Sequence, residues 1–98
     1  MILVRNVFQL QFGKAKEAME MMSDGRAIMK SAGYSNVRFC SDVTGRFYTF
    51  VLELTFDNLS AFESSRSEMG KVAGWQAWYD SFSQLVESGH REIYTIVE

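Results

Sequence analysis

The stretch ILVRNVFQLQF, residues 2–12, decides the fold because its apolar and polar side chains alternate. A period of two places successive side chains on opposite faces of a β-strand. One face would carry Ile2, Val4, Asn6, Phe8, Leu10 and Phe12, and the other Leu3, Arg5, Val7, Gln9 and Gln11. The sequence therefore predicts an opening strand, and Asn6 interrupts the apolar face that should look toward the helices.

A helix is predicted next, over KAKEAMEMMSDGRAIMKSAG, residues 14–33. The segment is rich in Ala, Met, Lys and Glu, which favour helices, and it lies between Gly13 and a terminating Gly33. At helical spacing its inward stripe would consist of Ala15, Ala18, Met22, Gly25, Met29 and Ala32. These side chains are small or flexible, so they leave room for larger groups opposite.

Two β-rich runs follow, SNVRFCSDV at residues 35–43 and RFYTFVLELTF at residues 46–56. Thr44-Gly45 between them predicts a hairpin with a tight turn. DNLSAF, residues 57–62, then opens a second helical region, with Asp57 or Asn58 as its cap.

The second helical region is predicted to run to about Ser88, with breaks at Gly70 and Gly74. HREIYTIVE, residues 90–98, would close the chain as a strand. The order β-α-β-β-α-β predicts one ferredoxin-like α+β domain over residues 1–98, with a four-stranded antiparallel sheet and its helices on one face.

The strands place apolar residues on both faces of this sheet. Phe47 and Val51 oppose Tyr48, Phe50, Leu52 and Leu54 on the third strand, and Ile93 and Val97 oppose Tyr94 and Ile96 on the last. Helices cover only one face, so the other needs a second cover. A short chain can provide it most easily with a second copy, which predicts a homodimer built sheet to sheet.

These features resemble the dimeric α+β barrel superfamily, and within it the NIPSNAP-like and antibiotic biosynthesis monooxygenase-like proteins. The resemblance covers nearly the whole chain. It rests on the first strand leading into a Lys/Glu-rich helix, on TFDNLSAFESS at residues 55–65, and on the aromatic stretch before EIYTIVE at residues 92–98. It implies the fold. Because such proteins include cofactor-independent oxygenases, haem-degrading enzymes and proteins with no known reaction, it does not choose an activity.

The haem-degrading members typically carry an Asn on the first strand, and a Trp and a His in the second helical region. Asn6 matches the first position, whereas Ser65 and Trp75 occupy the other two. The chain's single histidine, His90, falls at the start of the last predicted strand and suggests no proximal haem ligand. We therefore expect no cofactor, and no metal either, because one His and one Cys do not make a site.

The stretch GWQAWYDSF, residues 74–82, carries the candidate site. Trp75, Trp78, Phe82 and Leu85 share a helical stripe, which is typical of a core. The alternative is an apolar cleft between helices and sheet, lined by Trp75, Trp78, Tyr79 and Met22 with Asn6 at its floor. The resemblance to cofactor-free oxygenases implies that the Asn6 carboxamide would be catalytic, holding a substrate carbonyl or developing oxyanion.

Other function classes find less support in the composition. The formal net charge is −2, so no positive field draws nucleic acid. ILVRNV and RFYTFVLE resemble the two signatures of an RNA-recognition motif, yet Leu3, Phe47, Thr49 and Glu53 occupy positions that the motif reserves for other residue types. The lone Cys40 is predicted to be a small buried hydrophobe.

The sequence shows neither a signal peptide nor a membrane span, so we expect a cytoplasmic protein. The leading hypothesis is a dimer that binds a small apolar or aromatic molecule in the helix–sheet cleft and acts as a cofactor-independent monooxygenase-like enzyme. The alternative is a non-catalytic homodimeric interaction module, with an RNA-binding domain as a third possibility.

Overall fold

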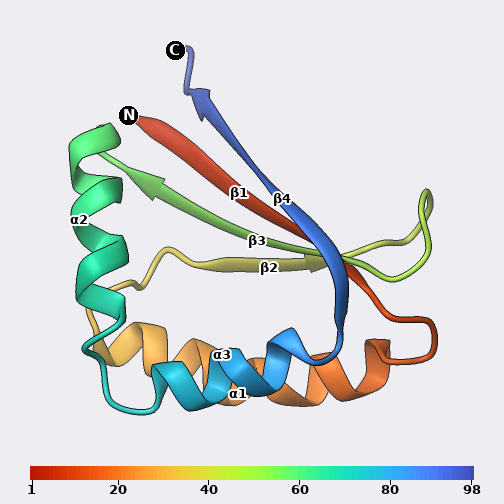
Figure 1. Ribbon diagram of the computed structural model, residues 1–98. Coiled ribbons are helices and arrows are strands. Elements are labelled where there is room, and N and C mark those ends of the chain that lie inside the picture. Colours follow the sequence, from red (N-terminus) through yellow and green to blue (C-terminus); the bar gives the residue numbers. More distant parts are fainter.

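The computed structural model describes residues 1–98 and contains one antiparallel sheet and three helices. Along the chain these are β1 (Ile2–Leu10), α1 (Ala15–Ser31), β2 (Arg38–Ser41), β3 (Thr49–Phe56), α2 (Leu59–Met69), α3 (Trp75–Ser83) and β4 (Val86–Thr95). The strand order is β2-β3-β1-β4, and all the helices lie on one side of the twisted sheet (Figure 1). The predicted ferredoxin-like arrangement is confirmed.

β1 lies at the centre of the sheet, between β3 and β4. Its register sets Asn6 opposite Leu52 on β3 and Arg91 on β4. Since directly opposed residues share a face, these three side chains look toward the helices together. The predicted alternation of β1 is confirmed, because Val4 and Leu10 on the same face are buried.

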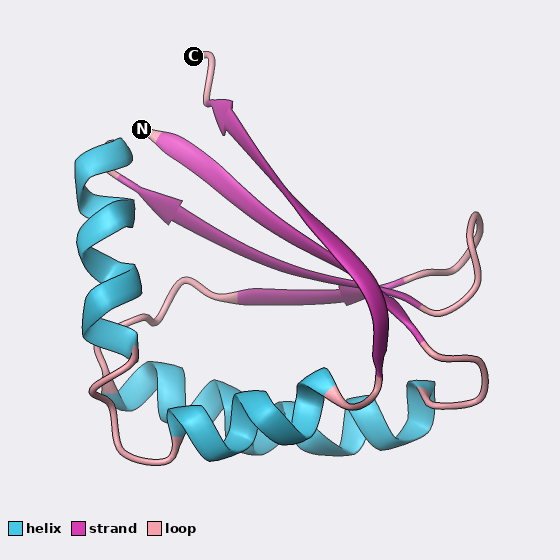
Figure 2. Ribbon diagram, viewed as in Figure 1, coloured by secondary structure: helices cyan, strands magenta, loops and turns pink.

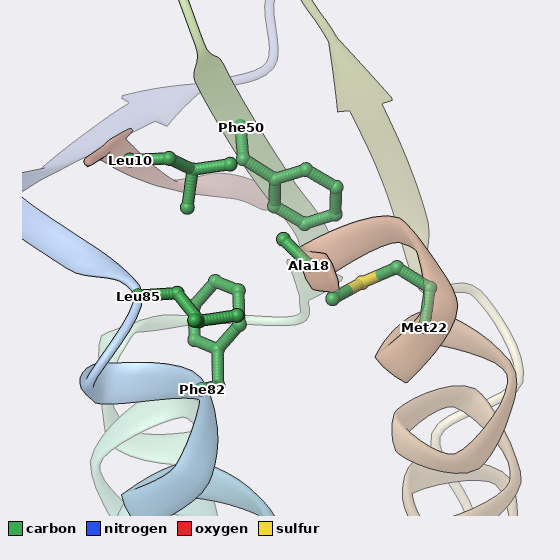
Figure 3. Close-up of a cluster of buried hydrophobic side chains, with 6 residues drawn as sticks. All are labelled: Leu10, Ala18, Met22, Phe50, Phe82 and Leu85. Atoms are coloured by element: carbon green, nitrogen blue, oxygen red, sulfur yellow. The ribbon is translucent and has the colours of Figure 1, made fainter. Parts of the chain in front are cut away.

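Two buried clusters hold the helices against the sheet. The first joins α1 and the end of α3 to the sheet and consists of Leu10, Ala18, Met22, Phe50, Phe82 and Leu85 (Figure 3). The second joins α1 and α2 to β3 and consists of Met29, Val37, Leu52, Leu54 and Met69. The predicted inward stripe of α1 is confirmed for four of its members. The buried residues of this helix are Ala18, Met22, Gly25 and Met29.

The second helical region is divided into two helices, as its glycines predicted. Asn58 caps α2, its Oδ1 accepting a hydrogen bond from the Ala61 N–H at 2.8 Å. Gly70 follows the end of α2, and Gly74 adopts φ 86°, a left-handed conformation that suits glycine and starts α3 in a new direction. As a result α2 stands across one end of the sheet, while α3 runs beside α1 (Figures 1 and 2).

Three local predictions were wrong. The connection between β2 and β3 spans residues 42–48 instead of a tight two-residue turn, and Tyr48 in it has φ 58°. β4 begins at Val86 rather than His90, because its pairing with β1 continues past a bulge near Leu10. Cys40 is exposed, because it lies on the short edge strand β2.

The sheet face turned away from the helices, which we call the open face, differs from the apolar face expected. It carries Leu3, Arg5, Val7 and Gln9 of β1, with Val51 and Glu53 of β3 and Glu92 and Tyr94 of β4. Arg5 lies between Glu53 and Glu92, with N–O distances of 2.9 Å to each, and Arg38 reaches Glu53 at 2.6 Å. The strand register therefore sets a paired charge network among the apolar residues.

None of the helices combines the length and the apolar character needed to span a lipid bilayer.

Candidate ligand-binding cleft

Two adjoining hollows open between the sheet and the helices. The large hollow, about 510 Å³, lies along α3, and its walls include Phe8, Phe39, Phe50 and Phe82. The small hollow, about 200 Å³, lies under α2, and its walls include Met29, Phe56 and Phe62. Both are lined by Asn6, Leu52, Trp75, Tyr79 and Arg91. We call the two hollows together the cleft.

A ladder of aromatic rings on α3 forms one wall of the large hollow. The Trp75 and Trp78 rings lie 5.4 Å apart at 23°, and the Trp78 and Phe82 rings lie 5.3 Å apart at 5°. The ladder arises because residues three or four apart share one face of a helix. Tyr79 extends it sideways, 5.6 Å from Trp75.

Trp78 is fixed by α1 as well as by its stacked neighbours. Its Nε1–H donates to the Met21 carbonyl at 2.9 Å. Its ring also lies against Gly25, where an added Cβ would stand 2.5 Å from Trp78 Cζ2. The residues of the aromatic stretch thus occupy different positions. Phe82 is buried in the core, and Trp78 packs against the core and also lines the large hollow. Trp75 and Tyr79 border both hollows.

A hydrogen-bonded pair, Asn6 and Arg91, forms the polar part of the cleft. Arg91 Nε donates to Asn6 Oδ1 at 2.7 Å across the β1–β4 ladder. This bond uses the acceptor of the carboxamide and leaves its Nδ2–H₂ group as a hydrogen-bond donor. Hence Asn6 can donate to an oxygen atom of a bound molecule, which is the role expected of it.

Arg91 is a polar residue of the cleft that was not predicted from the sequence, as are Tyr34 and Arg66 of the small hollow. The signal was the alternation of the last strand, in which Arg91 shares a face with Ile93, and Ile93 pairs with Val4 of the helix-facing side. Extending the period of two back from Ile93 would have placed Arg91 on the same, helix-facing side of the sheet as Asn6.

The contacts of Met22 and His90 differ from those expected of residues that bind a ligand in the cleft. Met22, predicted to line the cleft, belongs to the buried cluster in Figure 3, where it packs near Ala18 and Phe50. It packs in the same cluster as Phe82, and it lines neither hollow. His90 contributes to the rim of the large hollow, yet its ring bonds to Glu92 on the open face, 3.1 Å away.

The small hollow also holds Tyr34, whose hydroxyl lies 3.5 Å from Glu68 Oε2. Burial raises the pKa of Tyr34 above its ordinary value, and the nearby Glu68 carboxylate raises it further. Tyr34 therefore stays protonated through the physiological range and acts in the cleft as a neutral hydroxyl.

Chemically, the cleft joins stacked aromatic faces to a carboxamide donor and a guanidinium. Flat aromatic molecules match such walls, because offset or parallel rings gain dispersion and electrostatic energy. The polar pair can fix the orientation of such a molecule through its oxygen atoms.

No protein-family model matches the chain, and no curated protein matches it either. Solved structures do. A NIPSNAP family protein from Agrobacterium tumefaciens superposes with a TM-score of 0.89 at 19% identity, covering 99% of this chain and 93% of that one. A NIPSNAP domain protein from Burkholderia xenovorans gives 0.84 at 17% identity, covering 99% and 95%.

SnoaB, a cofactor-independent oxygenase from Streptomyces nogalater, superposes with a TM-score of 0.72 at 12% identity, covering 99% of this chain and 93% of that one. Identities this low speak to the fold and leave the activity open. The chain therefore has the α+β fold shared by NIPSNAP family proteins and antibiotic biosynthesis monooxygenase-like proteins, as its sequence predicted.

Proposed function

We propose that the protein binds a small flat aromatic molecule in the cleft and oxygenates it without a cofactor. One observation carries the proposal: the free amide group of Asn6 borders a hollow of about 510 Å³ with a stacked aromatic wall. The chain shares its fold with SnoaB, a cofactor-independent oxygenase, so the fold is compatible with this reaction class.

The reaction suits an aromatic ketone with an acidic CH₂ group. Loss of one proton to solvent gives an enolate, whose oxygen accepts a hydrogen bond from Asn6 Nδ2. The enolate carbon gives its electrons to O₂ and forms a C–O bond, and the resulting peroxide anion takes up a proton from solvent to become a hydroperoxide. Loss of the second C–H proton and cleavage of the O–O bond then leave a carbonyl and one water. One CH₂ and one O₂ thus become one C=O and one H₂O.

In this scheme the protein supplies binding and electrostatics. Trp75, Trp78 and Tyr79 hold the ring and exclude water from the reacting carbon. Asn6 stabilises the enolate oxygen, and the Arg91 bond to Asn6 Oδ1 keeps the amide in position and polarises it.

Oxygen uptake with anthrone, which yields anthraquinone, tests the proposal. Asn6→Asp keeps the shape and the acceptor for Arg91 but removes the donor, so we expect turnover to fall about 10²-fold while the fold is retained. Gln76→Ala, which removes an amide from the exposed side of α3, is the matched control and should retain activity. No uptake above the spontaneous rate by the unaltered protein, or full activity of Asn6→Asp, would refute the oxygenase.

A second candidate, a non-catalytic homodimeric interaction module in the cytoplasm, is favoured by a different observation. Phe12, Val43 and Phe47 are exposed at one end of the sheet, and the rings of Phe12 and Phe47 both contact Tyr48. Exposed apolar groups of this kind often mark protein contacts. If this candidate is correct, Asn6→Asp has no functional effect, and Phe12→Ser weakens the assembly of dimers into larger species in sedimentation velocity.

A further inference from the structure

We propose that the ligand of the cleft is an aromatic anion whose carboxylate or similar oxyanion binds Arg91, where the two hollows meet. The inference rests on the proposed function, because it requires a ligand in the cleft. It adds to that function the charge and the orientation of the ligand.

The first support is the unpaired charge of Arg91. Its single side-chain hydrogen bond goes from Nε to the neutral Asn6 carboxamide, and no carboxylate lies within ion-pairing distance of it. Arg5 and Arg38, by contrast, both contact Glu53. The two Nη groups of Arg91 therefore remain free to hold an oxyanion with the planar fork that guanidinium offers.

A second guanidinium lines the same small hollow. The Cζ atoms of Arg91 and Arg66 lie 5.2 and 6.0 Å from the centre of the Phe62 ring. Arg66 has one carboxylate near it, Glu63 Oε2 at 3.8 Å, in an exposed pair that contributes little. Two like charges around one ring repel each other, and an anion between them would relieve the repulsion.

Acidic side chains are absent from the cleft. Neither hollow is lined by an Asp or a Glu, although the chain has 12 acidic residues and a net charge of −2. The cleft is thus a basic site in an acidic protein. A preference for anions must come from this local arrangement, because the overall charge of the protein repels them.

The shape of the cleft indicates where each part of the ligand binds. The large hollow, with its aromatic ladder, takes the ring system, and the junction beside Arg91 takes the anionic group. Trp75 and Tyr79 border both hollows and hold the ring next to its charged end. The Asn6 amide is left for a second oxygen of the ligand.

A matched pair of fluorescent probes tests the inference: 8-anilinonaphthalene-1-sulfonate and N-phenyl-1-naphthylamine, which differ by the sulfonate alone. We expect the anionic probe to bind about tenfold more tightly, as one charge-assisted contact warrants. Arg91→Gln should abolish that difference and change the affinity for the neutral probe less than about twofold. Arg46→Gln, which removes the same charge from the β2–β3 connection, should change neither affinity.

The outcomes separate the two proposals. Equal binding of both probes, or an anion preference that survives Arg91→Gln, overturns the anion inference and leaves an aromatic site in place. Failure of both probes to bind overturns the cleft as a ligand site and the inference with it. Arg91→Lys keeps the charge without the fork, so it should retain part of the preference and give a second test if Arg91→Gln fails to fold.

Discussion

At the scale of single residues, the contact between Gly25 and Trp78 sets the position of the aromatic wall. An alanine Cβ at residue 25 would stand 2.5 and 2.7 Å from two atoms of the Trp78 ring. The ring is also stacked on Phe82 and on Trp75, so it has little room to move. A glycine that lowers helix propensity is therefore kept in α1 because it admits the indole.

Gly25→Ala is expected to lower the free energy of unfolding by about 1–3 kcal/mol, since overpacking outweighs the helix propensity that alanine gains. Urea unfolding followed by circular dichroism measures it. Gly70→Ala is the matched control: Gly70 has φ −61°, and its added Cβ meets nothing nearer than 3.6 Å, so alanine there should be neutral or stabilising. Equal destabilisation by both variants would contradict the packing role of Gly25.

Glu53 makes the stability of the fold sensitive to acid. Hydrogen bonds from Arg38 and Arg5, with their positive charges, lower its pKa below the ordinary value, against the opposing effect of burial. A lowered folded-state pKa stabilises the fold above the unfolded value of about 4.3, and this stabilisation is lost as the pH falls through the folded-state value.

Glu53→Gln should cost about 1 kcal/mol at pH 7 and make the decline in stability between about pH 5 and pH 3 shallower. Thermal unfolding measured across this range gives the slope directly. Parallel curves for the two proteins would contradict the pairing of Glu53 with Arg38 and Arg5.

Prediction from sequence reached the site only in part. Asn6 stood out because one polar residue interrupts an apolar strand face, and Trp75, Trp78 and Tyr79 lie with it along one cleft. Met22 belongs to the inward stripe of α1. Helical spacing predicts that such residues face the core, but it does not predict which of them line a cleft and which are covered by neighbouring side chains. Arg91 was missed because its side chain is exposed, as a charged residue usually is, and only the β1–β4 register sets it beside Asn6.

At the scale of elements, α2 depends on its cap. Asn58 supplies the side-chain acceptor for the Ala61 N–H, whereas Asp57, the other candidate from the sequence, has no such bond. Asn58→Ala should lower the free energy of unfolding by about 1 kcal/mol. Asp57→Ala should change it by no more than about 0.5 kcal/mol, and a reversed order in chemical denaturation would assign the cap to Asp57.

Elements with strong local signals were predictable, and those set by tertiary pairing were less so. The period of two in β1 and the stripe of α1 are properties of consecutive residues, and both are confirmed. The tight turn at Thr44-Gly45 failed because residues 42–48 form a wider connection, in which Asp42 Oδ1 accepts from the Thr49 N–H at 2.9 Å. The start of β4 at Val86 depends on β1, far away in sequence.

At the scale of the whole molecule, we predict that two copies of the chain pair through their open faces. We expect a homodimer of about twice the 11.2 kDa of one chain in light scattering. Val7, at the centre of the open face beside Val51, is the sensitive position: Val7→Arg should give monomers, because it buries an unpaired charge between the sheets. Gln76→Arg on the exposed side of α3 should remain dimeric, and a monomeric unaltered protein would exclude the pairing.

The overall architecture could be predicted because element order and strand patterning restrict a short chain to few topologies. The depth of the cleft could not, because it depends on how α2 and α3 diverge at Gly70 and Gly74 and on the twist of the sheet (Figure 1). Sequence patterns state which faces meet, whereas the space left between them is a property of the assembled molecule.

The most direct test of the account is a ¹H–¹⁵N NMR titration with N-phenyl-1-naphthylamine, because it reports where an aromatic molecule binds. We predict shifts of the Trp75 indole N–H, the Asn6 side-chain amide and the backbone amide of Leu52, which all border the cleft. The backbone amides of Glu53 and Tyr94 should move less, since their side chains lie on the open face. Shifts confined to the open face, or no shifts at all, would contradict a ligand-binding cleft between the helices and the sheet.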